Sequence, residues 1–213
     1  PQTHSQAAMP QFRKGQQAVM DFQSMKVDRF LVNDAVTGYG VAFAADEAQL
    51  LDEARKVAGS IPPKLLEVLD DEIRKGGPEN AIGVCREKAP QMAKAASEKT
   101  GWAIRRVSLK NRNPKAVPDA WEKGVLEEFD RRAAAGDKPT GLEKGELLTV
   151  DGQHVYRYMK ALPTQDLCLQ CHGTADRISP AVQAKLLELY PNDKAVGYSA
   201  AEIRGAITIR KPL

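Results

Sequence analysis

The sequence lacks several features that would point to common functional classes. No stretch approaches the ~18 consecutive apolar residues of a membrane span, so we expect no transmembrane segment. A net charge of +3 gives no reason to expect a nucleic-acid-binding surface, and no internal repeat is visible. Aromatic residues make up only 6% of the 213 residues. A buried apolar group would supply the bulk that aromatic side chains do not.

The most informative stretch is CLQCHG, at residues 168–173. Two cysteines separated by two residues and followed at once by histidine form the pattern that attaches a c-type haem. A thioredoxin-like redox pair would lie near the first strand of a βαβ unit, whereas this motif is near the C-terminus. A structural zinc site would need a second ligand pair, and the remaining cysteine and histidines are distant: Cys85, His4 and His154.

The motif predicts one covalent haem c. The thiols of Cys168 and Cys171 would each add to a haem vinyl group, and the imidazole of His172 would be the proximal ligand of the iron. Because c-type haem is normally attached outside the cytoplasmic membrane, we expect a periplasmic protein whose signal peptide has been removed before Pro1. Cys85 is then left without a partner for an intramolecular disulfide.

The residue opposite His172 determines what the iron can do. All five methionines precede the motif, unlike in small carriers that have an N-terminal motif and a later Met ligand. Cys85 lies on the small-residue face of a predicted helix, and a thiolate is a strong ligand of haem iron. A buried thiol that acts as a small hydrophobe is an equal alternative. Met92, His154 and an open sixth position are further alternatives.

Hydrophobic periodicity predicts an α+β arrangement. A helical stripe from about residue 46 to 73 contains Pro62-Pro63, which indicates a kink or a restart after Ser60. Gly76-Gly77 should end this helix. The remaining elements expected are helices at about 78–99, 118–135 and 180–190, strands at 102–109 and 203–209, and a hairpin at 147–162 that turns at Asp151-Gly152. Residues 1–45 have only broken patterning, and we interpret them as an extension that wraps the 46–213 domain or docks a partner.

Five stretches of the chain match a known family in the right order. They resemble the Tll-type family of monohaem c-type cytochromes and haem-sensor domains, which have a PAS-like fold. The resemblance runs from about residue 46 to the end. It rests on residues 77–90, 107–114, 118–122, 168–173 and 202–207.

The resemblance implies a PAS-like mixed or antiparallel sheet flanked by helices, with a long N-terminal helical region and the haem in the PAS-type pocket. It also implies axial ligation by the motif histidine and by the cysteine of the Ala-Ile-x-x-Cys helix. In this sequence these residues are His172 and Cys85.

Two further residues are candidates for haem contacts. Arg112 has a planar guanidinium that suits the propionate carboxylates, although a surface arginine is the alternative interpretation. Tyr156 precedes the motif on a strand that would line the pocket, together with Arg157 and Tyr158. Ordinary sheet packing is the alternative for that strand.

Electron transfer is the function that we expect. A thiolate ligand stabilises Fe(III), so the potential of this cytochrome should be low. The alternative is a redox or gas sensor in which Cys85 dissociates on reduction and NO or CO takes its place. The sequence carries no kinase and no transducing coiled coil, which favours a carrier that serves a redox partner protein or a membrane-bound electron-transfer complex. We expect no enzymatic activity, and homo-oligomer formation stays open.

Overall fold

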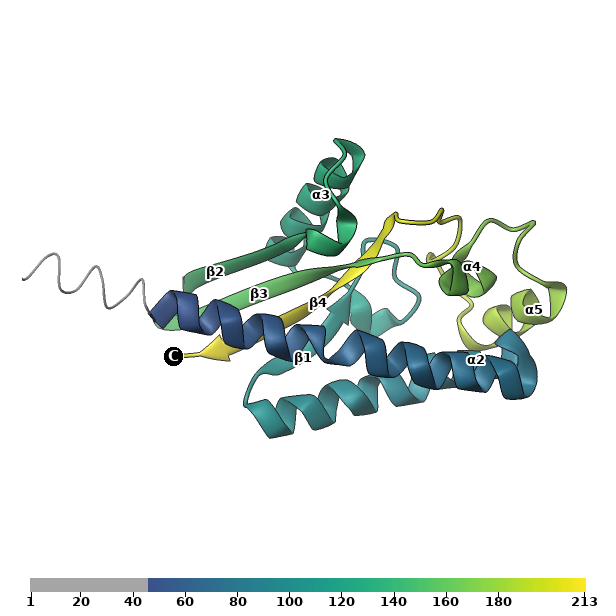
Figure 1. Ribbon diagram of the computed structural model, residues 1–213, viewed down its shortest axis with the longest axis horizontal. Coiled ribbons are helices and arrows are strands. Elements are labelled where there is room, and N and C mark those ends of the chain that lie inside the picture. The colour runs from purple at the N-terminus through teal and green to yellow at the C-terminus, as the bar shows by residue number, and fades with distance from the viewer. Residues whose placement is uncertain (1–45) are drawn as a thin grey trace, which may run out of the picture. The chain divides into compact units, whose positions relative to one another are not determined.

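The computed structural model describes residues 46–213 and has an α+β architecture. At its centre is a four-stranded antiparallel sheet in the order β1-β4-β3-β2, with helices packed against it (Figure 1). This arrangement confirms the predicted α+β class and the helix-flanked sheet. The extension predicted over residues 1–45 lies outside the described residues, so its docking or wrapping role stays a prediction.

A long helical hairpin precedes the sheet. A first helix covers residues 46–59, and α2, Ile61–Thr100, restarts after Ser60 as the Pro62-Pro63 pair predicts. Gly77 interrupts α2 with φ 81° and ψ 167°, a conformation that is accessible essentially to glycine alone. Figure 1 shows the chain reversing direction after this helical region has run the length of the sheet. The predicted break between two helices is therefore confirmed.

Replacing Gly77 by alanine is expected to lower the free energy of unfolding by about 1–3 kcal/mol. The alanine would have to hold a φ of 81°, and its Cβ would lie 2.9 Å from a carboxylate oxygen of Glu79. Chemical denaturation followed by circular dichroism measures this loss. Gly83→Ala is the matched control, because a Cβ at Gly83 meets nothing within 4 Å in the same helix. The control should stabilise the protein by about 0.5–1 kcal/mol, and equal effects of the two substitutions would contradict a special requirement at residue 77.

The four strands lie at the predicted positions, and β2 differs most from the prediction in length. The β2–β3 hairpin turns at Asp151-Gly152, whose φ values of 51° and 79° suit a two-residue type I′ turn. Strand β2 begins at Glu143 rather than near Leu147, because the polar run before Leu147 has no alternating pattern yet pairs with the long strand β3. The bounds are β1 Ala103–Val107, β2 Glu143–Val150, β3 Gln153–Pro163 and β4 Ile203–Pro212.

Helices bury both faces of the sheet. Helix α3, Ala120–Ala134, begins with a capping box between Asp119 and Glu122. It packs Phe129 and its apolar neighbours against one face, where Met159 and Ala206 belong to the same core cluster. The helix at residues 46–59 contributes to a second cluster on the opposite face. In β3 and β4, neighbouring side chains belong to opposite clusters, as Tyr158 and Met159 do, because successive side chains of a strand point to opposite faces. That second cluster includes Trp102, Tyr156, Tyr158, Ile207 and Ile209.

A third cluster holds the far end of the domain together. Helix α4, Asp166–His172, carries the cysteine motif, and α5 covers Pro180–Leu189. Ile82 of α2 packs with Val182 and Leu186 of α5, and Cys171 lies against this cluster. The motif therefore lies close to the point where α2 reverses.

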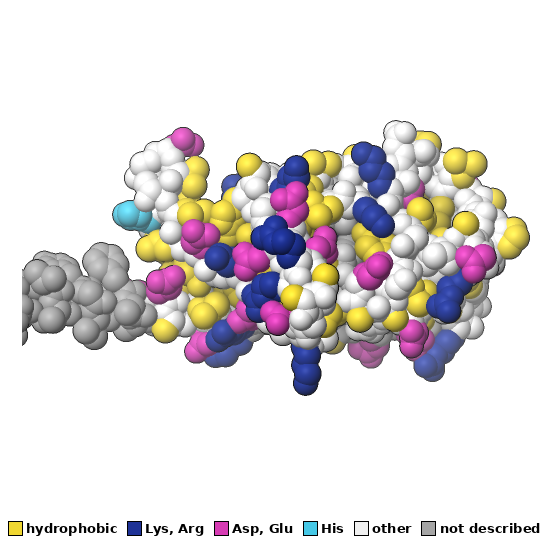
Figure 2. Space-filling model, turned by 90° about the horizontal axis from the view of Figure 1, so that it is seen from above, with side chains coloured by type: hydrophobic (Ala, Val, Ile, Leu, Met, Phe, Trp, Pro, Cys, Tyr) yellow, Lys and Arg dark blue, Asp and Glu magenta, His cyan; other side chains and the backbone are white. Residues whose placement is uncertain are grey.

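The outer surface carries both signs of charge. On the face in Figure 2, Lys and Arg side chains lie between Asp and Glu side chains and do not gather into one extended patch. Among the helices of residues 46–213, none combines the length and the apolar character that crossing a bilayer requires.

Candidate functional site

The motif residues share one side of a short helix. In α4, the spacing i, i+3 and i+4 places Cys168, Cys171 and His172 next to one another. Cys168 and His172 are buried, and Cys171 is partly buried. Burial raises the pKa of the Cys171 thiol to about 11. Cys171 is therefore a neutral thiol at physiological pH. Its sulfur points toward the start of the second arm of α2, residues 78–100, and lies 4.0 Å from the carbonyl oxygen of Pro78.

His172 is held as a neutral imidazole with a defined tautomer. Its Nδ1 lies 2.6 Å from the carbonyl oxygen of Ala195, and its Nε2 lies 3.2 Å from Nη1 of Arg204. A guanidinium only donates and a carbonyl only accepts, so Nδ1 must carry the proton and Nε2 must carry the lone pair. Burial, followed by the charges of Arg204, Arg112 and Arg106, lowers the pKa of His172 well below its usual range.

Arg112 connects the segment before α3 to the motif and to the loop after α5. Its Nε donates to Asp193 at 2.9 Å, and its Nη2 donates to the carbonyl oxygen of Cys171 at 2.6 Å and to that of Ala195 at 3.4 Å. The other carboxylate oxygen of Asp193 accepts from the Ala195 amide at 2.8 Å. Arg112 thus fixes the position of the same Ala195 carbonyl that orients His172.

Cys85 lies on the second arm of α2, about two helical turns after Pro78. It is exposed, whereas the neighbouring Ile82 is buried against α5. The same arm approaches the motif, because Cys171 packs against the cluster that includes Ile82 and its sulfur lies 4.0 Å from the carbonyl oxygen of Pro78. The structure therefore brings the two predicted halves of the site, the second α2 arm and α4, to the same end of the domain.

The predicted aromatic candidates lie elsewhere. Tyr156 is buried beneath the first helix, with its ring 6.2 Å from that of Trp102 and nearly perpendicular to it. The hydroxyl of Tyr158 donates to Glu143 at 2.8 Å, and Arg157 lies on the ring of Trp121 beside α3. The structure does not bring these residues to α4, because only the last residues of β3 reach the motif.

Two arginines at the site were not singled out from the sequence. Arg106 of β1 and Arg204 of β4 belong to strands with an alternating pattern, in which arginines normally face solvent. The Nε atoms of both are instead buried and have no hydrogen-bond partner within residues 46–213. Burial, followed by repulsion from Arg204, lowers the pKa of Arg106 to about 9. The only sequence signal was the occurrence of an arginine on each of two predicted strands, and their proximity depends on strand order.

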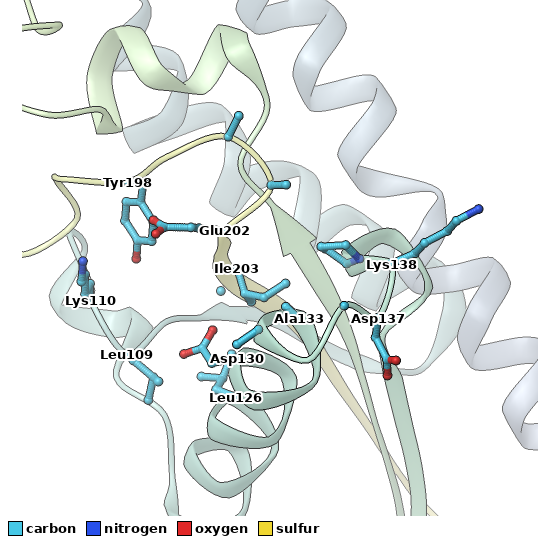
Figure 3. A pocket seen from close by; sticks show the side chains of 16 residues that line it. Leu109, Lys110, Leu126, Asp130, Ala133, Asp137, Lys138, Tyr198, Glu202 and Ile203 are labelled. Carbon is cyan, nitrogen blue, oxygen red and sulfur yellow. The ribbon is translucent and has the colours of Figure 1, made fainter.

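A cavity of about 740 Å³ lies next to this site. Tyr198 lines the cavity, and its ring packs edge-on against His172 with the centroids 6.4 Å apart. Figure 3 shows Tyr198 and Lys110 on one side of the cavity and Asp130 of α3 on another. Burial, followed by the charge of Glu202, raises the pKa of Asp130. The ring of Tyr198 therefore separates the imidazole of His172 from a partly polar cavity.

Comparisons with known proteins agree with this architecture. The sequence model of the Tll0287-like family matches residues 6–212, so the resemblance reaches further toward the N-terminus than residue 46, where we expected it to begin. The crystal structure of the cyanobacterial heme-protein Tll0287 is similar in fold, with a TM-score of 0.54 and 24% sequence identity over 79% of this chain and 95% of that one. No curated protein matches the sequence. The extent of the family match shows that the chain belongs to the Tll0287-like family.

Proposed function

We propose that this protein is a periplasmic monohaem c-type cytochrome that transfers electrons at low potential. Cys168 and Cys171 would hold the haem covalently, and His172 and Cys85 would be the axial ligands of the iron. The similar cyanobacterial protein is described as a heme-protein, and the spacing of the motif is that of a c-type attachment site.

The hydrogen bonding of His172 is the observation that carries this proposal. Histidines that ligate a metal through Nε2 commonly donate Nδ1–H to a carbonyl or carboxylate group, which fixes the ring orientation. His172 donates from Nδ1 to Ala195, and burial keeps its ring neutral. Neutral imidazole is the form that binds metals. A buried histidine with this tautomer, one residue after Cys171, fits the requirements of an iron ligand.

The other residues of the site would tune and protect it. A haem supplies one-electron exchange between Fe(III) and Fe(II). A thiolate from Cys85 would favour the ferric form, which is the basis for the low potential that we propose. Arg112 would keep the Ala195 carbonyl in place, and Tyr198 would shield one side of the imidazole. We assign no catalytic reaction, because His172 and Cys85 would occupy both axial positions. The electron donor and acceptor would be a redox partner protein or a membrane-bound complex.

A sensor is the second candidate function, because Cys85 lies on α2 outside the three hydrophobic clusters. A ligand outside these clusters can leave the iron without disrupting a packed core. Reduction would then release the thiolate and open a position for NO or CO. Carbon monoxide that binds the reduced protein stoichiometrically would support sensing, whereas an unchanged reduced spectrum under carbon monoxide would support the carrier.

Covalent attachment is the most direct test of the proposal. After expression with a haem-attachment system, the haem should remain with the protein on extraction with acidified acetone. The Cys168→Ala/Cys171→Ala variant should release all of its haem into the organic layer, because neither thioether can form. Release of haem from the unmodified protein would contradict a c-type cytochrome.

A further inference from the structure

Two arginines come together beside the motif because β1 and β4 approach closely. Gly205 has φ 142°, and a Cβ at this position would lie 2.3 Å from the carbonyl oxygen of Val107. Only glycine allows this approach. Next to this contact, the side chain of Arg106 reaches the main chain of β4, where its Nη2 donates to the carbonyl oxygen of Arg204 at 3.2 Å.

Neither arginine has a counter-charge in the described part of the chain. No carboxylate of residues 46–213 lies within 4.0 Å of either guanidinium, although Arg105 on the same strand pairs with Glu122 and Arg112 pairs with Asp193. Both Nε–H groups are buried without an acceptor over the same residues. Both side chains are partly buried with their Nε atoms shielded from water, so placing the two cations near each other is costly, since each loses hydration and repels the other. Such a pair is stable when an anion with two charges lies between or beside the guanidinium groups.

The surroundings of the pair indicate which anion this is. Nη1 of Arg204 lies 3.2 Å from Nε2 of His172, and Arg106 donates to the carbonyl oxygen of the same Arg204. Both arginines therefore lie beside the proposed iron ligand. A ligated Nε2 can no longer accept from Arg204, which leaves that guanidinium free for a carboxylate.

We propose that Arg106 and Arg204 together bind the two propionate carboxylates of the haem. This inference rests on the proposed function, and it assigns to these arginines the contact that the sequence suggested for Arg112. The Nε and Nη2 of Arg112 are already used by Asp193 and by two backbone carbonyls. Planar guanidinium forks match carboxylates in a bidentate manner, so two arginines suffice for two propionates.

The test uses the haem-loaded protein and the variants Arg106→Gln and Arg204→Gln. A cation near the iron favours the reduced state, so its removal should favour the ferric state. At a fixed applied potential, each variant should shift the ferric-to-ferrous ratio about tenfold toward ferric, which is a midpoint potential lower by ~59 mV for one electron. The propionate-bending band in the resonance Raman spectrum should move to lower frequency in the same variants, and a purely structural role would not move it.

Two controls separate this inference from the proposed function. Arg210→Gln removes an exposed arginine from the same strand β4, and its midpoint potential should equal that of the unmodified protein. Arg106→Lys keeps the charge but loses the fork, so it should keep most of the potential while the Raman band still shifts. Covalent haem in every variant, with potentials and Raman bands that do not move, would overturn the propionate assignment alone. Absence of haem from the unmodified protein would instead overturn the proposed function.

Discussion

Cys85→Ser is expected to abolish the absorption and low-spin EPR signature of His/thiolate iron while the haem stays covalently attached. A serine hydroxyl is a far poorer ligand of ferric iron than a thiolate, so the ferric state loses its main stabilisation. The midpoint potential should rise by at least ~59 mV, a tenfold change in the ferric-to-ferrous ratio. Spectroelectrochemical titration of the two proteins measures this shift.

Met92→Leu is the control for this substitution. Met92 is on the same arm of α2, and its thioether was the next candidate ligand in the sequence. Its replacement by leucine conserves volume and should leave the spectrum unchanged. If Cys85→Ser keeps the spectrum of the unmodified protein and Met92→Leu changes it, the thiolate assignment is wrong and methionine is the sixth ligand.

Arg112→Ala is expected to lower the free energy of unfolding by about 3–5 kcal/mol. The side chains of Arg112 and Asp193 are only 12% and 11% exposed, so removing the cation leaves a buried carboxylate without its partner. At ~2–4 °C per kcal/mol for a domain of this size, the melting temperature should fall by at least ~6 °C. Thermal unfolding followed by circular dichroism gives the value.

Arg55→Ala provides the comparison for Arg112→Ala. Arg55 also forms an ion pair, with Glu143, but its side chain is 47% exposed. Water therefore screens this pair, and its loss should cost no more than about 1 kcal/mol. Equal melting temperatures for the two variants would mean that the hydrogen bonds and the ion pair of Arg112 do not stabilise the loop at residues 190–198.

Local features of the fold were predictable because they depend on adjacent residues. Glycine at residue 77 and the Asp151-Gly152 pair require special backbone angles, so each could be located from its own sequence. The start of β2 could not, because Glu143 is a strand residue only by pairing with Lys160 of β3. Tertiary partners decide such cases.

The candidate site was predictable only in part, for a similar reason. The motif cysteines and His172 have a fixed spacing, whereas Arg106 and Arg204 are distant in sequence and meet through the pairing of β1 with β4. Tyr156 precedes the motif in sequence, but an extended strand places it about 3.3 Å further away with each residue. Proximity in sequence was therefore a poor guide to proximity to His172.

The acceptor for the His172 ring is a main-chain carbonyl, and this has a consequence for mutational tolerance. Exchanging the side chain at Ala195 leaves that oxygen in place, so the position itself offers little control over the basicity of the imidazole. The basicity of the imidazole depends instead on Arg112 and Asp193, which set the position of this oxygen without contacting the ring. Relatives that differ at these two positions would keep the same histidine, but the basicity of its imidazole would differ.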